Sequence, residues 1–271
     1  MVHPPSLTWP TMKLSVVIPA HNEEGSIESA VKAISDKLSE ASIAYEIIVV
    51  NDSSQDRTET ILIRLHEQDH RIRLVNNAPP NGFGFAVRKG LESMEGDAVV
   101  IVMADSSDDP DDIVTYYRKL EEGYDCVFGS RFIKGSKVTN YPMHKLILNR
   151  LANFFIRILF GLKFNDITNA FKGYRLEVVR GLQPLLSPHF NLTVELPLKA
   201  IVRGYSYTTV PIRWYGRTVG VSKLKIKEMG SRYLFIVLYI WLEKWLSRGD
   251  YYRIENERNH SPEICPEDKL P

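Results

Sequence analysis

The sequence predicts an α/β fold with a mostly parallel central sheet flanked by helices. Short apolar segments typical of strands alternate with longer segments in which apolar residues recur every three or four positions, as on one face of a helix. This alternation favours parallel strands joined by crossover helices that cover both faces of the sheet. The chain has 271 residues, 44% of them hydrophobic, which is enough for one large core.

Five strands are expected in the first half of the chain, with helices between them. The expected strands are Leu14–Ile18, Glu46–Val50, Ile72–Val75, Val99–Met103 and Asp125–Gly129. Asn22 is the expected N-cap of the first helix, because a short polar side chain there can accept a hydrogen bond from the first turn. Asp109, followed by Pro110, is the expected N-cap of the fourth helix.

After Arg131 the pattern changes to longer helical segments. Helices are expected over Met143–Phe160, Thr193–Arg203 and Met229–Leu246, with a strand over Tyr205–Arg213. One domain is therefore expected over residues 1–247. Residues 248–271 are polar and lack periodicity, so they are expected to form a mobile tail.

The overall charge is close to balance, but the charges are unevenly distributed. The net charge of +1, from 34 basic and 33 acidic residues, gives no reason to expect a nucleic-acid partner. Eight carboxylates lie between Asp105 and Asp125, whereas nine Lys and Arg residues and a single acid lie between Arg131 and Arg175. An acidic segment is thus followed at once by a basic one.

Cysteine usage and hydropathy favour a reducing, cytoplasmic compartment. The two cysteines form no framework of paired spacings. The first ten residues lack a charged region followed by an apolar one, so no signal peptide is expected. The longest apolar run near the C-terminus, Tyr233–Leu242, is about half of the roughly 20 residues that a membrane-spanning helix needs.

The stretch VVIVMADSSDDP, residues 99–110, places several carboxylates directly after a buried strand. Ligands of parallel α/β sheets bind beyond the carboxyl ends of the strands. Helix capping explains Asp109 but leaves Asp105 and Asp108 without a role. The polar loops Pro19–Glu23 and Asn51–Asp56 follow two other strands, so the three loops are expected to line one crevice.

Two common nucleotide-binding motifs are absent from the sequence. No GxxxxGK[ST] phosphate loop is present, and no GxGxxG follows the first strand, which argues against a P-loop NTPase and a typical NAD enzyme. A nucleotidyltransferase is disfavoured as well, because no Gly- and Lys-rich loop follows the first strand.

Six strings resemble those of the family 2 glycosyltransferases and occur in the family's order over about residues 13–246. They are SVVIPAHNEE, EIIVVNDSSQDRT, MADSSDDP, GSRF, DITNAFKGYR and RTVGVSKLK. The chain most resembles the family's dolichol-phosphate mannose synthase-like branch. This resemblance implies a GT-A-type fold, with a nucleotide-binding half over about residues 13–130 and an acceptor-side half over about 131–247. It also implies a nucleotide-diphosphate sugar as donor, a divalent metal, and a polyprenyl phosphate lipid as acceptor.

The resemblance implies a donor-nucleotide site at the first two strand ends. Pro19, Ala20 and Glu23 would lie against the nucleotide. Asp52 would hydrogen-bond the base or ribose, with Ser53 beside it.

The resemblance also implies a site for Mg²⁺ or Mn²⁺ at the end of the fourth strand. Asp105 corresponds to the second acid of the family's metal motif, with Ser107 or Asp108 assisting, whereas Met103 stands in place of the first acid. A hard cation can use one or two carboxylates together with phosphate oxygens and waters, so the lost acid need not abolish binding. The alternative interpretation is a helix-capping loop that holds no metal.

Basic residues after position 130 match the family's acceptor-phosphate site. Arg131, Lys145 and Arg150 match residues that meet the phosphate, although nine basic residues could also form an ordinary solvated surface. A further three residues match a loop that closes over the donor diphosphate and the acceptor: Arg217, Ser222 and Lys223.

Asp166 and Glu195 are the remaining acid candidates, and each is either a general base or a structural partner for Arg175. A phosphate monoester has a second pKa of roughly 6 and is already a dianion near neutrality, so a phosphate acceptor needs positioning more than a base. For a hydroxyl acceptor, a base would contribute about 10²- to 10⁴-fold. The candidate catalytic residues are thus Asp105, Arg131, Asp166, Glu195 and Lys223.

The expected activity is inverting transfer of a hexose, mannose or glucose, from a GDP- or UDP-sugar to a dolichyl or undecaprenyl phosphate. The enzyme is expected to be peripheral on the cytoplasmic face of a membrane, attached through Met143–Phe164 and Tyr233–Trp245. Two alternatives stay open: a soluble family 2 enzyme acting on a saccharide or lipid hydroxyl, and a non-catalytic nucleotide-sugar or lipid-binding protein. The oligomeric state is open as well.

Overall fold

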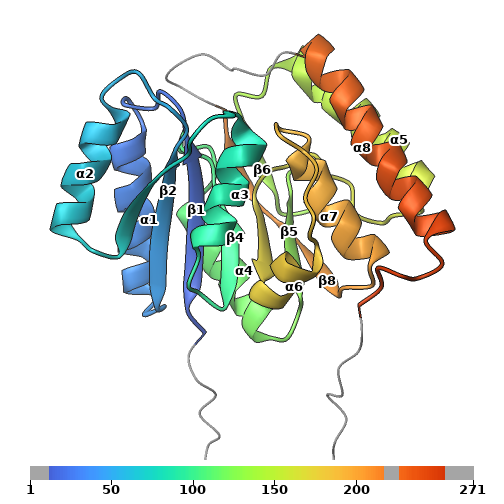
Figure 1. The fold of residues 1–271 in the computed structure, drawn as a ribbon, viewed down its shortest axis with the longest axis horizontal. Coiled ribbons are helices and arrows are strands. Elements are labelled where there is room, and N and C mark those ends of the chain that lie inside the picture. Colours follow the sequence, from blue (N-terminus) through green and yellow to red (C-terminus); the bar gives the residue numbers. More distant parts are fainter. Residues whose placement is uncertain (1–11, 217–225, 254–271) are drawn as a thin grey trace, which may run out of the picture.

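The computed structural model describes residues 12–216 and 226–253, with only the backbone over residues 226–229. Its centre is a seven-stranded sheet in the order β3-β2-β1-β4-β7-β5-β8 (Figure 1). The strands are β1 (Leu14–Ala20), β2 (Tyr45–Asn51), β3 (Ile72–Asn76), β4 (Ala98–Ile101), β5 (Cys126–Ser130), β7 (Lys172–Arg175) and β8 (Tyr207–Pro211). The prediction of an α/β fold with a mostly parallel sheet is confirmed.

Strand β7 is the exception to the parallel arrangement. It pairs antiparallel with β4 on one side and with β5 on the other, whereas the other neighbouring pairs are parallel. Because β7 runs in the opposite direction, the residues that precede it lie at the edge of the sheet where the parallel strands end. The 164–171 loop therefore joins the loops that follow β1, β2, β4 and β5.

Helices cover both faces of the sheet, which explains why its strands are nearly continuous apolar runs. One core lies between the sheet and α1, α2 and α4, and contains Val16 and Ile18 of β1. The other core contains Val17 of β1 and is covered by α3, α5, α7 and α8. The helices are α1 (Ile27–Glu40), α2 (Thr58–Gln68), α3 (Phe83–Ser93), α4 (Pro110–Glu121), α5 (Met143–Phe160), α6 (Leu176–Gly181), α7 (Leu192–Val202) and α8 (Ile226–Leu246).

A short two-stranded ribbon, β6 (Lys137–Thr139) paired with β9 (Arg213–Tyr215), lies at the carboxyl-end edge of the sheet. The backbone amide of Tyr215 donates to the carbonyl of Ser107, 3.0 Å away. Trp214 forms an isolated bridge with Asp108. The ribbon therefore fixes the loop that follows β4.

Of the two predicted helix caps, one is confirmed and the other is wrong. Asp109 caps α4, since its side chain accepts from the amide of Asp111, 3.0 Å away, and Pro110 is the first helical residue. Helix α1 begins at Ile27 with Ser26 before it, so Asn22 is not its cap. Instead, Asn22 has a left-handed φ of 54°, and its Oδ1 accepts from the amide of Gln55, 2.7 Å away. Asn22 thus joins two loops rather than starting a helix.

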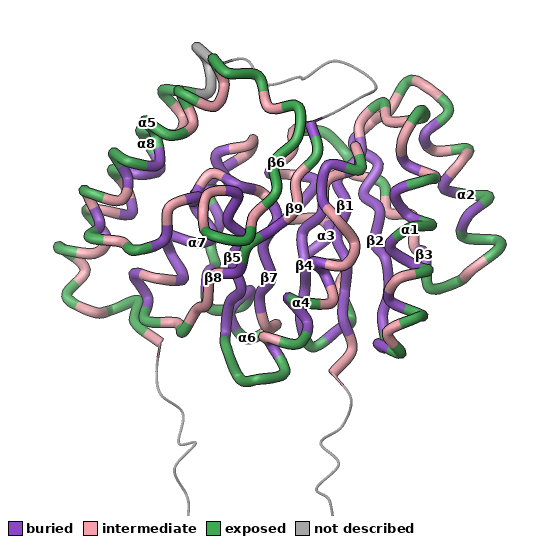
Figure 2. The backbone as a smooth tube through the Cα atoms, turned by 180° about the vertical axis from the view of Figure 1, so that it is seen from behind, coloured by how far each residue is buried: buried purple, intermediate pink, exposed green. Residues whose placement is uncertain are grey.

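Helices α5 and α8 lie side by side at one end of the sheet (Figure 2). Both helices expose large apolar side chains. We call these side chains the apolar edge. On α5 and α8 they are Met143, Ile147, Leu148, Leu151, Phe154, Phe155, Ile158, Leu234, Phe235, Leu238, Leu242, Trp245 and Leu246. Among the described residues, none of the helices combines the length and apolar character that crossing a bilayer requires.

The first six residues of the expected tail, 248–253, contact the domain through Arg253. The backbone amide of Arg253 donates to the carbonyl of Arg203, 2.9 Å away, and its guanidinium lies 2.6 Å from a carboxylate oxygen of Asp125. These contacts hold residues 248–253 against the domain, because Asp125 is buried at the start of β5. Residues 254–271 lie outside the described part of the chain.

Candidate functional site

The candidate site lies at the carboxyl-end edge of the sheet, where polar loops from both halves of the chain meet. Asp52, one of the residues expected at the nucleotide, is buried at the end of β2. Its carboxylate accepts from the Asn77 side chain at 2.7 Å and from the Gly82 amide at 2.9 Å. The backbone carbonyl oxygen of Asp52 lies 2.7 Å from Nδ1 of His21. Asp52 therefore fixes the loop that leads into α3.

The other four residues expected at the nucleotide surround the ends of β1 and β2. Pro19 and Ala20 are buried in β1, so the backbone is what they can offer to a ligand. The Glu23 carboxylate accepts from the Ser26 hydroxyl at 3.2 Å, and the Glu23 amide donates to Thr58 at 2.9 Å. Ser53 has a left-handed φ of 55° in the loop after β2.

The loop after β4 holds the three residues expected at the metal. Asp105 is half-buried, and its carboxylate accepts from the amide of Ser107 at 3.1 Å. Ser107 and Asp108 are buried. Oδ2 of Asp108 accepts from the amide of Met103 at 3.0 Å, so the loop closes on itself. Burial raises the pKa of Asp108 to about 7, and the nearby charge of Asp105 adds to this rise.

The acids of this loop could supply only part of the coordination of a metal ion, so other molecules would have to supply the remaining ligands. Within residues 12–216 and 226–253, no group of three or more His, Cys, Asp or Glu side chains is placed to hold a metal. Asp105, unlike the buried Asp108, is partly accessible from solvent, and its oxygens are ligands of the kind that hard divalent cations prefer. A metal here would need further oxygens, such as those of a bound diphosphate.

Arg131 and Asp166 form a buried, bidentate ion pair beside this loop. Nε and Nη2 of Arg131 donate to the two carboxylate oxygens of Asp166 at 2.8 and 2.7 Å, and its backbone amide donates at 3.0 Å. Asp166 is 0% and Arg131 9% exposed. Burial opposes the charge on Arg131, but Asp166 outweighs this effect and holds the pKa of the guanidinium above its ordinary value.

Aromatic rings enclose the rest of the Arg131 guanidinium. The rings of Phe132, Tyr141 and Trp214 have their centroids 5.3 to 5.6 Å from its central carbon. The guanidinium of Arg150, on α5, lies 4.5 Å from the centroid of the Phe132 ring. Lys145 is half-buried on the same helix, five residues before Arg150. The structure thus brings Arg131 and Arg150 to one aromatic cluster.

Residues 15–182 match the profile of the glycosyl transferase family 2. The chain belongs to this family. A polyprenol monophosphomannose synthase of Mycolicibacterium smegmatis is 30% identical to this glycosyltransferase over 244 residues, which cover 84% of this chain and 91% of the relative. A dolichol-phosphate mannosyltransferase of Pyrococcus furiosus is 32% identical over 222 residues, covering 80% of this chain; the match spans 61% of that protein's length.

Solved structures support the fold of this glycosyltransferase. Glucosyl-3-phosphoglycerate synthase from Mycobacterium tuberculosis in complex with UDP superposes with a TM-score of 0.63 at 21% identity, over 86% of this chain and 80% of that one. The complex of the same enzyme with Mn²⁺, UDP and phosphoglyceric acid gives a TM-score of 0.64 at 20% identity, over 86% and 78% of the two chains. The predicted GT-A-type architecture is confirmed.

The predicted pairing of Asp166 with Arg175 is wrong. Asp166 pairs with Arg131, and Arg175 instead donates to the backbone carbonyls of Leu120 and Tyr124. The side chains of Arg175 and Asp166 come from opposite ends of β7, because Arg175 ends that strand and Asp166 precedes it. The geometry also disfavours Asp166 as a general base, since both its oxygens already accept hydrogen bonds away from solvent.

Both carboxylate oxygens of Glu195 are also engaged in buried contacts. Glu195 is fully buried on α7, and its oxygens accept from the amides of Leu186 and Ser187, each at 2.7 Å. Lys199, one turn later, lies 2.7 Å from the same carboxylate. The expected pairing of Glu195 with Arg175 is therefore wrong, because this carboxylate holds the 184–188 loop and pairs with Lys199. A role of Glu195 as general base stays a prediction.

Sequence reasoning missed four residues of the candidate site. Phe132, Tyr141 and Trp214 enclose Arg131, and buried Lys172 holds the loop that carries Asp166. A lysine flanked by apolar and small residues in the string AFKGYR is a weak signal for burial. Arg217, Ser222 and Lys223 lie outside the described residues.

Proposed function

We propose that this chain transfers a hexose, mannose or glucose, from a GDP- or UDP-sugar to a polyprenyl phosphate, with inversion, at the cytoplasmic surface of a membrane. The observation that carries the proposal is one juxtaposition: Arg150 of α5 and Arg131 both lie over the Phe132 ring, and α5 also supplies half of the apolar edge. An acceptor with a charged head and an apolar chain fits this arrangement. The names of the two relatives support the transfer of mannose to a polyprenol or dolichol phosphate.

The apolar edge supports attachment to a lipid surface. On α5, Met143, Ile147, Leu151, Phe154 and Ile158 recur at helical spacing and form one stripe. Each large apolar side chain removed from water contributes on the order of 1.5 to 3 kcal/mol, so insertion of a few is enough for reversible binding. Exposed apolar patches of this extent mark interaction surfaces in soluble proteins.

The buried, engaged state of Asp166 and Glu195 fits a phosphate acceptor, which needs no general base. A phosphate monoester is already a dianion near neutrality, because its second pKa is roughly 6, so it can attack without a general base. Asp166 and Glu195 are both buried and engaged, which suits a reaction that needs none. A hydroxyl acceptor would need such a base. This difference favours the phosphate acceptor over the alternative of a saccharide or lipid hydroxyl.

Basic side chains would compensate the charge of the acceptor and of the leaving group. Arg131, Lys145 and Arg150 would hold the acceptor phosphate; the described contacts of Arg131 use three of its five N–H donors, two to Asp166 and one to Tyr141. Lys223, with Arg217 and Ser222, would close over the donor diphosphate. Preorganised charges of this kind stabilise the transition state without reorganisation.

A divalent cation, Mg²⁺ or Mn²⁺, would offset charge on the donor diphosphate when bound. Asp105 would be its carboxylate ligand, with Ser107 and Asp108 supporting the loop. The nucleotide would lie across the ends of β1 and β2, against Pro19, Ala20, Glu23, Asp52 and Ser53.

The test of this activity is a donor panel. The purified chain is incubated with undecaprenyl or dolichyl phosphate, Mg²⁺ or Mn²⁺, and GDP-mannose, GDP-glucose, UDP-glucose or UDP-mannose, and lipid-linked sugar is measured. We expect product with one donor, none with the matching polyprenol that lacks the phosphate, and loss of product with EDTA. Absence of lipid-linked sugar with every donor would overturn the proposal.

Two variants separate catalysis from mere binding. Asp105→Ala is expected to abolish turnover, whereas Ser106→Ala, at the exposed neighbouring residue, should retain it. Donor binding without turnover in the unmodified chain would instead support the non-catalytic alternative.

Vesicle flotation tests the membrane surface. With vesicles that contain anionic lipid, Phe154→Glu combined with Phe235→Glu is expected to weaken binding by at least tenfold. The matched control is Ile63→Glu, an equally apolar, exposed site on α2. Equal binding by both variants would contradict attachment through the apolar edge.

A further inference from the structure

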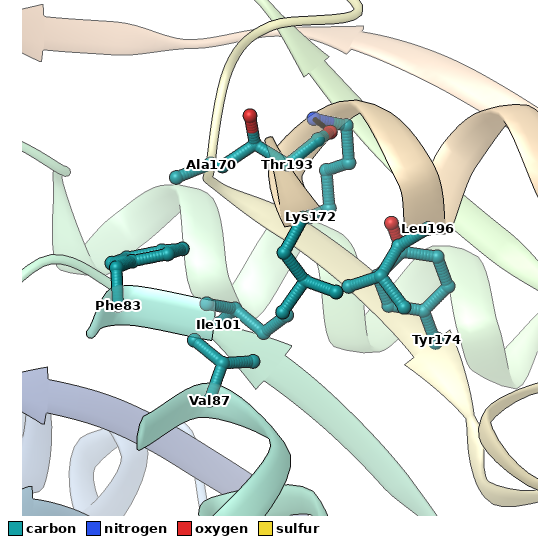
Figure 3. Close-up of a pocket in the computed structure, with 9 residues that line it drawn as sticks. Phe83, Val87, Ile101, Ala170, Lys172, Tyr174, Thr193 and Leu196 are labelled. Atoms are coloured by element: carbon teal, nitrogen blue, oxygen red, sulfur yellow. Dashed lines mark hydrogen bonds between the residues drawn. The ribbon is translucent and has the colours of Figure 1, made fainter. Parts of the chain in front are cut away.

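Lys172 is a fully buried lysine that the proposed reaction leaves without a role. It lies on β7, is 1% exposed, and runs between apolar side chains of α3, β4 and α7, including Val87, Ile101 and Leu196 (Figure 3). Burying an ammonium group costs several kcal/mol unless its hydrogen bonds are satisfied. Its partners therefore indicate what the residue does.

The three acceptors of the Lys172 ammonium are all backbone carbonyls. Nζ donates to Ile167 at 2.9 Å, to Asn169, and to Thr193 at 3.2 Å. Two of these carbonyls belong to the 164–171 loop, and the third lies in the first turn of α7. The ammonium thus links the 164–171 loop to α7 through hydrogen bonds.

The same loop carries Asp166, whose carboxylate holds Arg131 through two guanidinium bonds and one backbone bond. Asp166 immediately precedes Ile167, so the position of the Ile167 carbonyl constrains the position of the carboxylate. On the other side of the loop, the Asn169 side chain donates to the carbonyl of Gly129 at 3.2 Å. Lys172 and this bond both hold the loop, Lys172 to α7 and Asn169 to β5.

We propose that Lys172 is a positioning residue for the acceptor phosphate, acting through the 164–171 loop and Asp166 on the guanidinium of Arg131. The inference rests on the proposed function, in which Arg131 binds that phosphate. Lys172 does not touch the substrates. Its loss leaves the carbonyls of Ile167, Asn169 and Thr193 without their donor, which favours movement of the loop.

Steady-state kinetics with Lys172→Met test this role. Methionine keeps the length and apolar contacts but removes the ammonium. We expect the KM for polyprenyl phosphate to rise about 10- to 100-fold, by analogy with groups that orient metal ligands, and the KM for the donor to stay within about twofold. Lys172→Arg, which keeps the charge and donors, should recover part of the loss.

Lys199→Met is the matched control. Lys199 is also fully buried, but its ammonium pairs with Glu195 and donates to the carbonyl of Pro184, away from Arg131. This variant is expected to lose stability with the acceptor KM unchanged. An equal rise of acceptor KM in both lysine variants would reduce Lys172 to a structural residue.

Hydrogen exchange separates this inference from the proposed function. Asp166 accepts from the backbone amide of Arg131, so exchange at that amide reports the position of the carboxylate without any substrate. We expect faster exchange at Arg131 and over residues 164–171 in Lys172→Met than in Lys199→Met. Unchanged exchange would overturn the role of Lys172 even in an active enzyme. Faster exchange in a chain that forms no lipid-linked sugar would refute the acceptor but keep Lys172 as the anchor of Arg131.

Discussion

Replacing Asp166 with Asn should destabilise the protein more than a surface charge change does. The carboxylate accepts three hydrogen bonds from Arg131, at 2.7, 2.8 and 3.0 Å, and is 0% exposed. An asparagine oxygen can replace part of this set, but its amide group would face an N–H donor of Arg131. The guanidinium would then be buried with its charge uncompensated.

The expected magnitude follows from that geometry. Removing one partner of a buried ion pair costs about 3 to 5 kcal/mol, out of a total stability of about 5 to 15 kcal/mol. Asp36→Asn, at an exposed site on α1, should change the free energy of unfolding by no more than about 0.5 kcal/mol. The comparison isolates the effect of the buried pair from that of losing one negative charge.

Urea unfolding at neutral pH, followed by circular dichroism, measures both variants, and turnover is assayed on the folded protein. We expect Asp166→Asn to unfold at a lower urea concentration than the unmodified protein, with an unchanged dependence of the free energy of unfolding on urea. If Asp166 were a general base, the variant would keep its stability within about 0.5 kcal/mol and lose about 10²- to 10⁴-fold in kcat. That outcome would refute the assignment of Asp166 as the structural partner of Arg131.

Three further predictions concern other parts of the fold. Glu195→Gln should lower the free energy of unfolding, measured with urea, by about 3 kcal/mol, since it breaks a buried pair, while kcat stays within about twofold; a large fall in kcat with full stability would instead support a general base there. Burial raises the pKa of Glu46, but hydrogen bonds from a hydroxyl, a backbone amide and Arg73 outweigh it and hold the pKa below its ordinary value. Ionised Glu46 therefore stabilises the protein above the unfolded-state pKa of 4.5, and this contribution is lost as pH falls below that value. The difference in free energy of unfolding between the unmodified protein and Glu46→Gln should therefore shrink in acid. A difference that grows in acid would contradict the lowered pKa. Gly90→Ala should lower the thermal midpoint, because a Cβ would lie 2.4 Å from a side-chain atom of β1 and overpacking costs about 1 to 3 kcal/mol, whereas Gly230→Ala on α8, with no described atom within 4 Å, should raise it by helix propensity; the reverse order would refute the packing argument.

Features that depend on local patterns were predictable from the sequence. The helix over Met143–Phe160 agrees with the structure at both ends, and Asp109 caps α4 as expected, because both follow from short-range periodicity and capping chemistry. The expected strand over Val99–Met103 is shorter in the structure, since β4 ends at Ile101 and the next two residues already belong to the loop. Boundaries of this kind depend on which backbone groups find a neighbouring strand.

Features that depend on contacts between distant residues were not predictable. Asp166 and Arg131 are 35 residues apart, and nothing in either local string selects that pair over Asp166 with Arg175. Glu195 lies in the apolar helix α7, which is buried because α8 packs against it. The local sequence does not show this packing. The string with Lys172 leaves strand direction open, and only the antiparallel pairing of β7 brings the preceding loop to the site.

The strand order also constrains how the chain can fold. Strand β5 lies between β7 and β8, which come from residues 172–175 and 207–211. A nascent chain that has reached residue 130 can pair β3, β2, β1 and β4, but β5 has neither neighbour and β4 presents an open apolar edge. The sheet is completed only after some eighty more residues have been synthesised, so contacts between distant segments decide a late step of folding. A fragment ending at residue 130 is therefore expected to aggregate rather than to fold as an independent nucleotide-binding unit.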